Sequence, residues 1–151
     1  MYGSESFAGA LSETVLHDVP VRAQAKRVSQ RTLLRWRRST LAPSRALHLA
    51  QLHGHGFHAL GVSRAVLIES GPSGYARTAA VAQDLYQGDE RLDGLVWRSR
   101  QFDDALAVVL WATRVGPGDL EVVEERTLIG VGFAFHEAQL LLARARIVIT
   151  P

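Results

Sequence analysis

The first apolar pattern along the chain has the spacing of a helix. Phe7, Leu11 and Val15 recur every four residues, with alanines between them, and Pro20 follows. Positions four apart lie on one face of a helix, and proline disfavours its continuation. The pattern therefore predicts a short amphipathic helix over about residues 6–17.

The middle of the chain alternates short apolar runs with turn residues. Leucines at alternate positions favour a strand, a His-Gly-His-Gly run favours a turn, and Ser29 or Ser39 can each cap a helical turn. The predicted elements are a strand within residues 45–52, a turn at 53–56, one helical turn over 57–61, a loop at 70–74 and a helix from 75 to 88.

The last third of the chain contains continuous apolar runs, which are typical of buried strands. The predicted elements are strands over 94–97 and 105–111, an extended or mixed segment over 120–128, an amphipathic helix over 135–146 and a last strand over 147–149. Short helices and strands thus interleave along the sequence. This order predicts a single α+β domain with a mixed or antiparallel central sheet and flanking helices.

The composition agrees with one ordinary globular domain. The chain has 151 residues, 47% of them hydrophobic and 21% charged, which is enough to bury a core without cross-links. It contains no cysteine, so disulfides, thiolate metal sites and cysteine nucleophiles are excluded. No apolar run is long enough to cross a bilayer. We therefore expect a cytoplasmic protein that has no membrane partner.

Positive charge is concentrated in the first half of the chain. No acidic residue occurs between Asp18 and Glu69. The basic residues of this stretch are Arg22, Lys26, Arg27, Arg31, Arg35, Arg37, Arg38, Arg45 and Arg64. Such a one-signed region favours an anionic partner, namely a phosphate-bearing ligand, a nucleic acid or an acidic protein, unless it is simply a solvated surface.

Histidines and glycines near the middle of the chain do not form a known site pattern. Histidines occur at positions 48, 53, 55 and 58, but no nearby carboxylate completes a ligand set, and we interpret them as surface residues. The glycines at 54, 56 and 61 lack the spacing of a dinucleotide-binding fingerprint and the acidic residue that follows it. We therefore expect no metal and no bound cofactor.

Two residues gain meaning only from their context. Glu13 lies on the predicted opening helix, away from its apolar face, and Ser99 follows an apolar strand, between Arg98 and Arg100. By themselves they fit an exposed helical glutamate and a turn serine, which are common and carry no function.

Four separated blocks of the chain, taken in order, resemble the RES-domain toxin family. The blocks are Tyr2 with Ala10-Leu11-Ser12-Glu13-Thr14-Val15, the leucine-rich residues 45–61, Tyr75-Ala76-Arg77-Thr78 with the helix after it, and Asp93-Gly94-Leu95-Val96-Trp97-Arg98-Ser99-Arg100. The best match covers residues 2–115 of a domain that spans 1–151. The family is named for an arginine, a glutamate and a serine, and the resemblance aligns Glu13 and Ser99 with the last two. The family's arginine precedes its tyrosine, so we expect the domain to be N-terminally incomplete.

The resemblance implies a fold like that of ADP-ribosyltransferases and the role of toxin in a toxin–antitoxin system. Family members deplete NAD by cleaving its nicotinamide–ribose bond through hydrolysis, phosphorolysis or ADP-ribosyl transfer. For this chain it implies catalytic roles for Glu13 and Ser99 and NAD-binding roles for Tyr2 and Arg100, with NAD as the substrate. We expect Glu13 to stabilise the ribosyl cation and the arginine-rich half to supply cations for the pyrophosphate.

The resemblance also implies a partner, a cognate helix-turn-helix antitoxin, and it is compatible with a homo-oligomer. Two other functions stay open. Without the family's arginine, the chain could be a catalytically inactive RES fold that binds NAD or a protein without turnover. The arginines from Arg22 to Arg38 could bind nucleic acid, but Trp36 is the sole stacking aromatic among them, so we expect no direct nucleic-acid binding.

Overall fold

The central element of the fold is a four-stranded mixed sheet. The computed structural model describes the whole chain except residues 18, 20–24, 69–73 and 129–131. The sheet has the strand order β1-β6-β5-β4, where β5 pairs antiparallel with β6 and parallel with β4. Its strands are β1 (Tyr2–Ser4), β4 (Leu49–Leu52), β5 (Gly94–Arg98) and β6 (Leu106–Leu110). The predicted α+β class and mixed sheet are thus confirmed.

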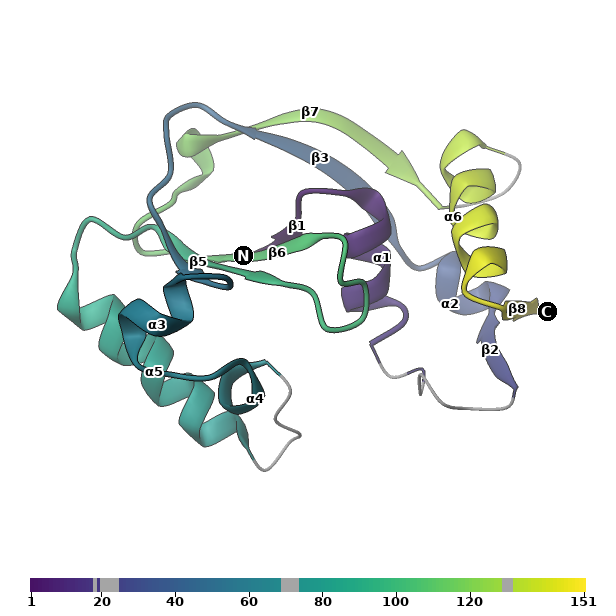
Figure 1. Cartoon of the computed structure of the whole chain (residues 1–151). Coiled ribbons are helices and arrows are strands. Elements are labelled where there is room, and N and C mark those ends of the chain that lie inside the picture. The colour runs from purple at the N-terminus through teal and green to yellow at the C-terminus, as the bar shows by residue number, and fades with distance from the viewer. Residues whose placement is uncertain (18, 20–24, 69–73, 129–131) are drawn as a thin grey trace.

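Two further strand pairs lie outside this sheet. One is a parallel pair formed by β2 (Lys26–Ser29) and β8 (Ile147–Thr150). The other is an antiparallel ribbon formed by β3 (Arg37–Pro43) and β7 (Leu120–Thr127), with a register shift between Thr40 and Leu41. In Figure 1 this ribbon arches above the central sheet and ends beside α6.

The helices are short and divide between the two ends of the molecule. They are α1 (Phe7–Thr14), α2 (Gln30–Leu33), α3 (Gly56–Leu60), α4 (Arg64–Leu67), α5 (Tyr75–Gly88), α6 (Phe133–Arg144) and the 3-10 turn η2 (Pro117–Asp119). Figure 1 places α3, α4 and α5 at one end, α2 and α6 at the other, and α1 between them. Among the described residues, none of these helices is long and apolar enough to traverse a membrane.

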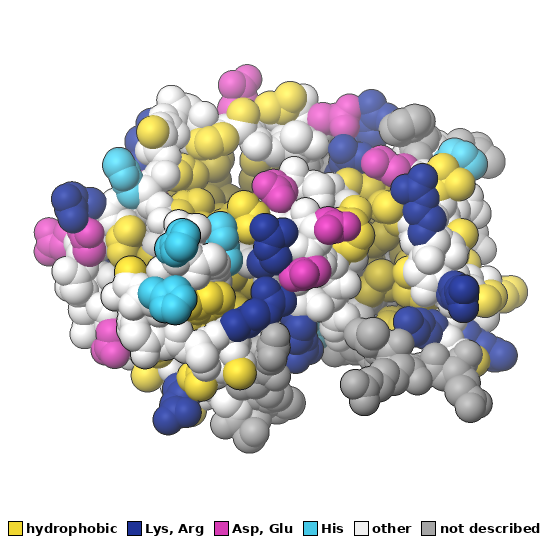
Figure 2. All heavy atoms as spheres, in the orientation of Figure 1, with side chains coloured by type: hydrophobic (Ala, Val, Ile, Leu, Met, Phe, Trp, Pro, Cys, Tyr) yellow, Lys and Arg dark blue, Asp and Glu magenta, His cyan; other side chains and the backbone are white. Residues whose placement is uncertain are grey.

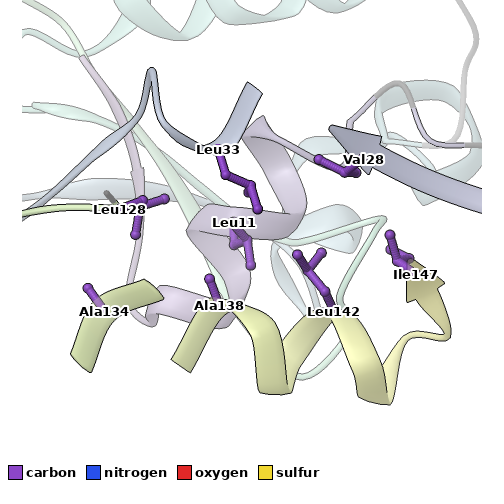
Figure 3. Close-up of a cluster of buried hydrophobic side chains, with 8 residues drawn as sticks. All are labelled: Leu11, Val28, Leu33, Leu128, Ala134, Ala138, Leu142 and Ile147. Carbon is purple, nitrogen blue, oxygen red and sulfur yellow. The ribbon is translucent and has the colours of Figure 1, made fainter. Parts of the chain in front are cut away.

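The hydrophobic core has two parts that correspond to these two ends. The first joins α1, α2 and β2 to α6 and β8, and Figure 3 shows its side chains converging around Leu11: Val28, Leu33, Leu128, Ala134, Ala138, Leu142 and Ile147. The second contains Leu52, Leu67 and Leu95 and receives one face of α5. The first part therefore anchors α1, and the second part forms the base beneath α5.

Most predicted elements are present, with shifted boundaries. The opening helix ends at Thr14 rather than 17, because Val15 caps it and the next residues form a turn. Gly61 closes α3 in the left-handed conformation, with φ 64°, as the glycine predicted. Ser29, not Ser39, is the capping serine, since its hydroxyl accepts a hydrogen bond from the amide of Thr32. The loop predicted at 70–74 lies almost entirely outside the described residues.

Candidate active site

Glu13 is carried by a helix that is fixed at its beginning and along one face. Ser6 caps α1 with an extended backbone, and its hydroxyl accepts a hydrogen bond from the amide of Gly9. Leu11 is 3% exposed in the core, and Ser12 is also buried. Because Leu11 and Ser12 hold one face of the helix in the protein, Glu13 occupies a defined position at the edge of that face.

The close approach of α1 to the central sheet determines how near Glu13 lies to the sheet. A β-carbon added at Gly9 would lie 2.2 Å from the hydroxyl oxygen of Ser4 and 2.7 Å from the β-carbon of Ala105. No side chain fits in that space, so glycine permits the helix to lie directly against β1 and the segment that leads into β6.

Ser99 meets Glu13 from the opposite side, at the end of β5. Its side chain is completely buried, and its hydroxyl donates a 2.5 Å hydrogen bond to Oε1 of Glu13. The hydroxyl oxygen of Ser99 also accepts hydrogen bonds from the amides of Gln101 at 3.1 Å and Phe102 at 2.9 Å. The hydroxyl is therefore fully engaged: it shapes the turn after β5 and orients the carboxylate.

Two more donors complete the environment of the Glu13 carboxylate. The hydroxyl of Tyr2 donates to Oε2 at 2.6 Å, and the amide of Arg100 donates to Oε1 at 3.2 Å. The structure thus brings together all of the predicted site residues, Tyr2, Glu13, Ser99 and Arg100, from three separate segments. Glu13 is partly buried, and the interpretation of an exposed helical glutamate without partners is wrong.

Tyr2 acts as a hydrogen-bond donor in this arrangement. Burial raises the pKa of its hydroxyl above the ordinary value, and the hydrogen bond to Glu13 and the negative charge of that residue raise it further. The proton therefore stays on Tyr2 at neutral pH. The ring packs against Trp97 with 5.6 Å between the centroids, which fixes the hydroxyl over the carboxylate.

The Glu13 carboxylate opens into a cavity of about 480 Å³ between the central sheet and α5. Its polar wall contains Tyr2, Glu13 and Arg100, while its floor is apolar and includes Leu52, Leu95, Trp97 and Val109. Ser99 is not among the lining residues, in agreement with its complete burial. The cavity is of the size found for small-molecule sites. A ligand there would meet the carboxylate of Glu13 and the side chain of Arg100 among mainly apolar side chains.

Sequence reasoning did not identify several other residues of this wall. His17, Gln101, Tyr75 and Thr78 also line the cavity, and the side-chain amide of Gln101 donates to the backbone carbonyl of His17 at 3.2 Å. The signal for His17 was its spacing, because it follows Glu13 by four residues. Tyr75 and Thr78 lie in one of the blocks that carry the family resemblance, but their place in the cavity wall depends on how α5 packs.

The arginine-rich first half does not supply the cations of this cavity, as far as the described residues extend. Arg37 pairs with Glu125, Arg38 with Glu137, Arg45 with Asp93 and Asp119, and Arg64 with Asp103. The arginine of the cavity wall is Arg100, from the second half. The expectation that the first half faces a pyrophosphate is therefore wrong for these residues, and Arg22 lies outside the described part.

Arg45 has a structural role at the start of β5. Its guanidinium donates to both carboxylate oxygens of Asp93, at 2.9 and 2.7 Å, and Asp93 also accepts from the amide of His48. The Arg45 hydrogen bonds, helped by that amide, lower the pKa of Asp93 to about 2 against the opposing effect of burial. This pair ties the loop before β4 to the start of β5. Within the described residues, no group of three or more His, Asp or Glu side chains could hold a metal ion.

A comparison with family models decides the classification. The model described as RES domain matches residues 1–129. The chain belongs to the RES domain family. No curated protein and no solved structure matches it at a significant level, so the likeness of the RES fold to ADP-ribosyltransferases stays a prediction.

The RES match contains the complete described site. Tyr2, Glu13, Ser99 and Arg100 all lie within the matched residues. Helix α6 and strand β8 lie beyond the match, yet Ala138 and Leu142 pack in the core that anchors α1. In this RES domain, segments outside the family match therefore support the helix that carries the site glutamate.

Proposed function

We propose that this RES domain is the toxin of a toxin–antitoxin pair and that it depletes NAD by cleaving the nicotinamide–ribose bond. The observation that carries the proposal is the Glu13 carboxylate, held by Tyr2, Ser99 and the amide of Arg100 at the wall of a largely apolar cavity. A carboxylate in that setting suits a reaction that develops positive charge on a sugar.

The chemistry requires such a group. When the bond between the ribose C1′ and the nicotinamide nitrogen breaks, nicotinamide leaves with the bonding electron pair and the ribose acquires oxocarbenium character. A preorganised negative charge beside the ribose stabilises that cation, and such groups lower barriers by about 3–4 kcal/mol. The oxygen of water, phosphate or a protein side chain then forms the new bond to C1′, and a nucleophile that carries a proton loses it.

The neighbouring residues have distinct parts in this proposal. Tyr2 and Ser99 orient Glu13, and Tyr2 also offers its ring to a planar group of the substrate. The side chain of Arg100 lines the cavity and matches the charge of a pyrophosphate. Ser99 acts through Glu13, because its hydroxyl is buried and already engaged.

The partner in this proposal is a helix-turn-helix antitoxin that covers the cavity. The support is the family membership together with the cavity, which is open to solvent and is lined by Glu13 and Arg100. A protein seated there would exclude NAD, so we expect the complex to be inactive and the free toxin to be active.

The decisive experiment measures nicotinamide release from NAD by the purified chain and by its Glu13→Gln variant. Glutamine keeps the shape but removes the charge, so turnover should fall by roughly a hundredfold or more. The matched control is Glu90→Gln, because Glu90 is exposed and does not line the cavity. If the wild type binds NAD, detected as a raised melting temperature, but releases no nicotinamide, the inactive NAD-binding form replaces this proposal.

A further inference from the structure

The fold brings together two stretches of sequence that contain no acidic residue. One is residues 25–36, which lead into β3, and the other is the segment after Glu137. Strand β2 from the first stretch pairs in parallel with β8 from the second, with Arg27 opposite Val148. Positive charges that lie far apart in the sequence therefore become neighbours.

The described arginines of the first half fall into two groups, those that form ion pairs and those that do not. Those from Arg37 onward form ion pairs with carboxylates of the second half. The described basic residues before Arg37 form no ion pair with any other described residue, and neither do Arg144 and Arg146. We define the basic surface as the resulting set: Lys26, Arg27, Arg31, Arg35, Arg144 and Arg146.

These side chains are accessible to a partner. All except Lys26, which is partly buried, are exposed. Among the described residues, Figure 2 shows Lys and Arg side chains with no Asp or Glu between them at the lower right of the view, over the end of the molecule that contains β2, α6 and β8 in Figure 1. A cluster of uncompensated charge costs stability through mutual repulsion, which an anionic partner would relieve.

We propose that the basic surface binds the phosphate backbone of nucleic acid, without sequence specificity. Five of its six cations are arginines, and one planar guanidinium can donate two parallel hydrogen bonds to the oxygens of a phosphate. Trp36 follows Arg35 directly and is 40% exposed, which offers an unpaired base a ring to stack on. An acidic protein segment would use the charge but would have no need of the exposed indole, so nucleic acid is the better fit.

This inference reverses the expectation from the sequence, and it is independent of NAD cleavage. The sequence places six of its basic residues between Arg22 and Arg37, whereas the fold adds Arg144 and Arg146 to that region. None of the six residues of the basic surface lines the cavity over Glu13. Loss of one activity therefore leaves the other intact.

The test is the binding of a fluorescent single-stranded oligonucleotide by anisotropy, over a range of salt concentrations. The variant Arg27→Gln, Arg35→Gln, Arg144→Gln removes three charges from the basic surface. The control Arg64→Gln, Arg77→Gln, Arg91→Gln removes three charges from α4, α5 and the loop after α5. For a single strand, log affinity decreases with log salt, and the magnitude of that slope should be smaller by about 2 in the variant. The affinity at low salt should fall by at least about tenfold. The control should keep the wild-type slope.

Three results would overturn the proposal. They are no binding by the wild type at about 50 mM salt, an equal loss of slope in the control, and competition by poly-glutamate as strong as that by unlabelled oligonucleotide. The last result would assign the basic surface to an acidic protein. A thermal melt of each variant verifies folding, which we expect to be preserved because the three substituted residues of the basic surface form no described ion pair.

Discussion

The hydroxyl of Ser99 donates a 2.5 Å hydrogen bond to the carboxylate of Glu13 across 86 positions of sequence. Ser99 is completely buried, whereas Glu13 lines the cavity. In the proposed function Glu13 contacts the substrate, whereas Ser99 orients the Glu13 carboxylate. This division makes different kinetic predictions for the two positions.

Ser99→Ala should lower kcat with little change in KM. The substitution removes one donor to Glu13 and leaves the amides of Gln101 and Phe102 without their acceptor, which costs about 1–3 kcal/mol of stability. Steady-state NAD turnover beside a thermal melt measures both effects. A rise in KM with an unchanged kcat would mean that Ser99 contacts the substrate directly and that the positioning role is wrong.

Tyr2→Phe should reduce NAD turnover by about tenfold and the free energy of unfolding by about 1 kcal/mol or less. The ring and its packing against Trp97 remain, while the 2.6 Å hydrogen bond to Glu13 is lost. A suitable control is Tyr86→Phe, since the hydroxyl of Tyr86 contacts Thr113 outside the cavity. Equal losses in the two variants would contradict a specific role for the Tyr2 hydroxyl.

Asp93 should make stability depend on pH in the acid range. Its pKa is about 2 in the folded protein and lies near 3.8 otherwise, so the folded state favours the ionised form. The resulting stabilisation is fully present above about pH 5 and is lost as the pH falls through about 4 towards 2. Melting temperatures between pH 7 and 2 should show a steeper acid decline for the wild type than for Asp93→Asn.

The Asp93→Asn variant should also be less stable at neutral pH, because the bidentate pair with Arg45 is broken. Asp104→Asn is the matched control, since Asp104 is exposed and should leave the acid decline unchanged. An identical acid decline in the wild type and in Asp93→Asn would show that other carboxylates dominate the acid range.

The sequence predicted elements better than it predicted contacts between them. The helix around Leu11 and the strands on either side of Ser99 follow from apolar spacing, which is a local property. The extended segment predicted over 120–128 is strand β7, but β3 and its pairing with β7 were not predicted, because Arg37–Pro43 has no regular apolar spacing and its partner is distant in sequence. Pairings such as Arg38 with Glu137 join residues that are 99 positions apart, and no local pattern contains that information.

The site was accessible from the sequence only through resemblance. Glu13 and Ser99 gave no signal by themselves, and the family blocks identified both. His17 and Gln101 lie outside the blocks that carried the resemblance, and the fold alone reveals them as neighbours in the cavity wall. The charge asymmetry was misleading for the site, because most described arginines of the first half are neutralised or lie elsewhere.

The last prediction concerns Gly9, because the absence of a side chain at this position allows α1 to lie directly against β1. Replacing glycine by alanine inside a helix ordinarily stabilises it by about 1 kcal/mol. At Gly9 the new β-carbon would overlap Ser4 and Ala105, and the latter contact is between two rigid atoms. Gly9→Ala should therefore destabilise the protein by about 1–3 kcal/mol and displace Glu13 from Ser99, with a fall in kcat.

Two further variants separate this steric effect from the general effect of alanine. Gly88→Ala, at the end of α5, meets no atom within 4 Å and should be neutral or slightly stabilising. Ala105→Gly removes the rigid contact, so in combination with Gly9→Ala it should restore part of the lost turnover and give a favourable coupling energy in a double-mutant cycle. Additive losses in that cycle would mean that α1 accommodates the methyl group by another movement, and that Gly9 does not set the position of Glu13.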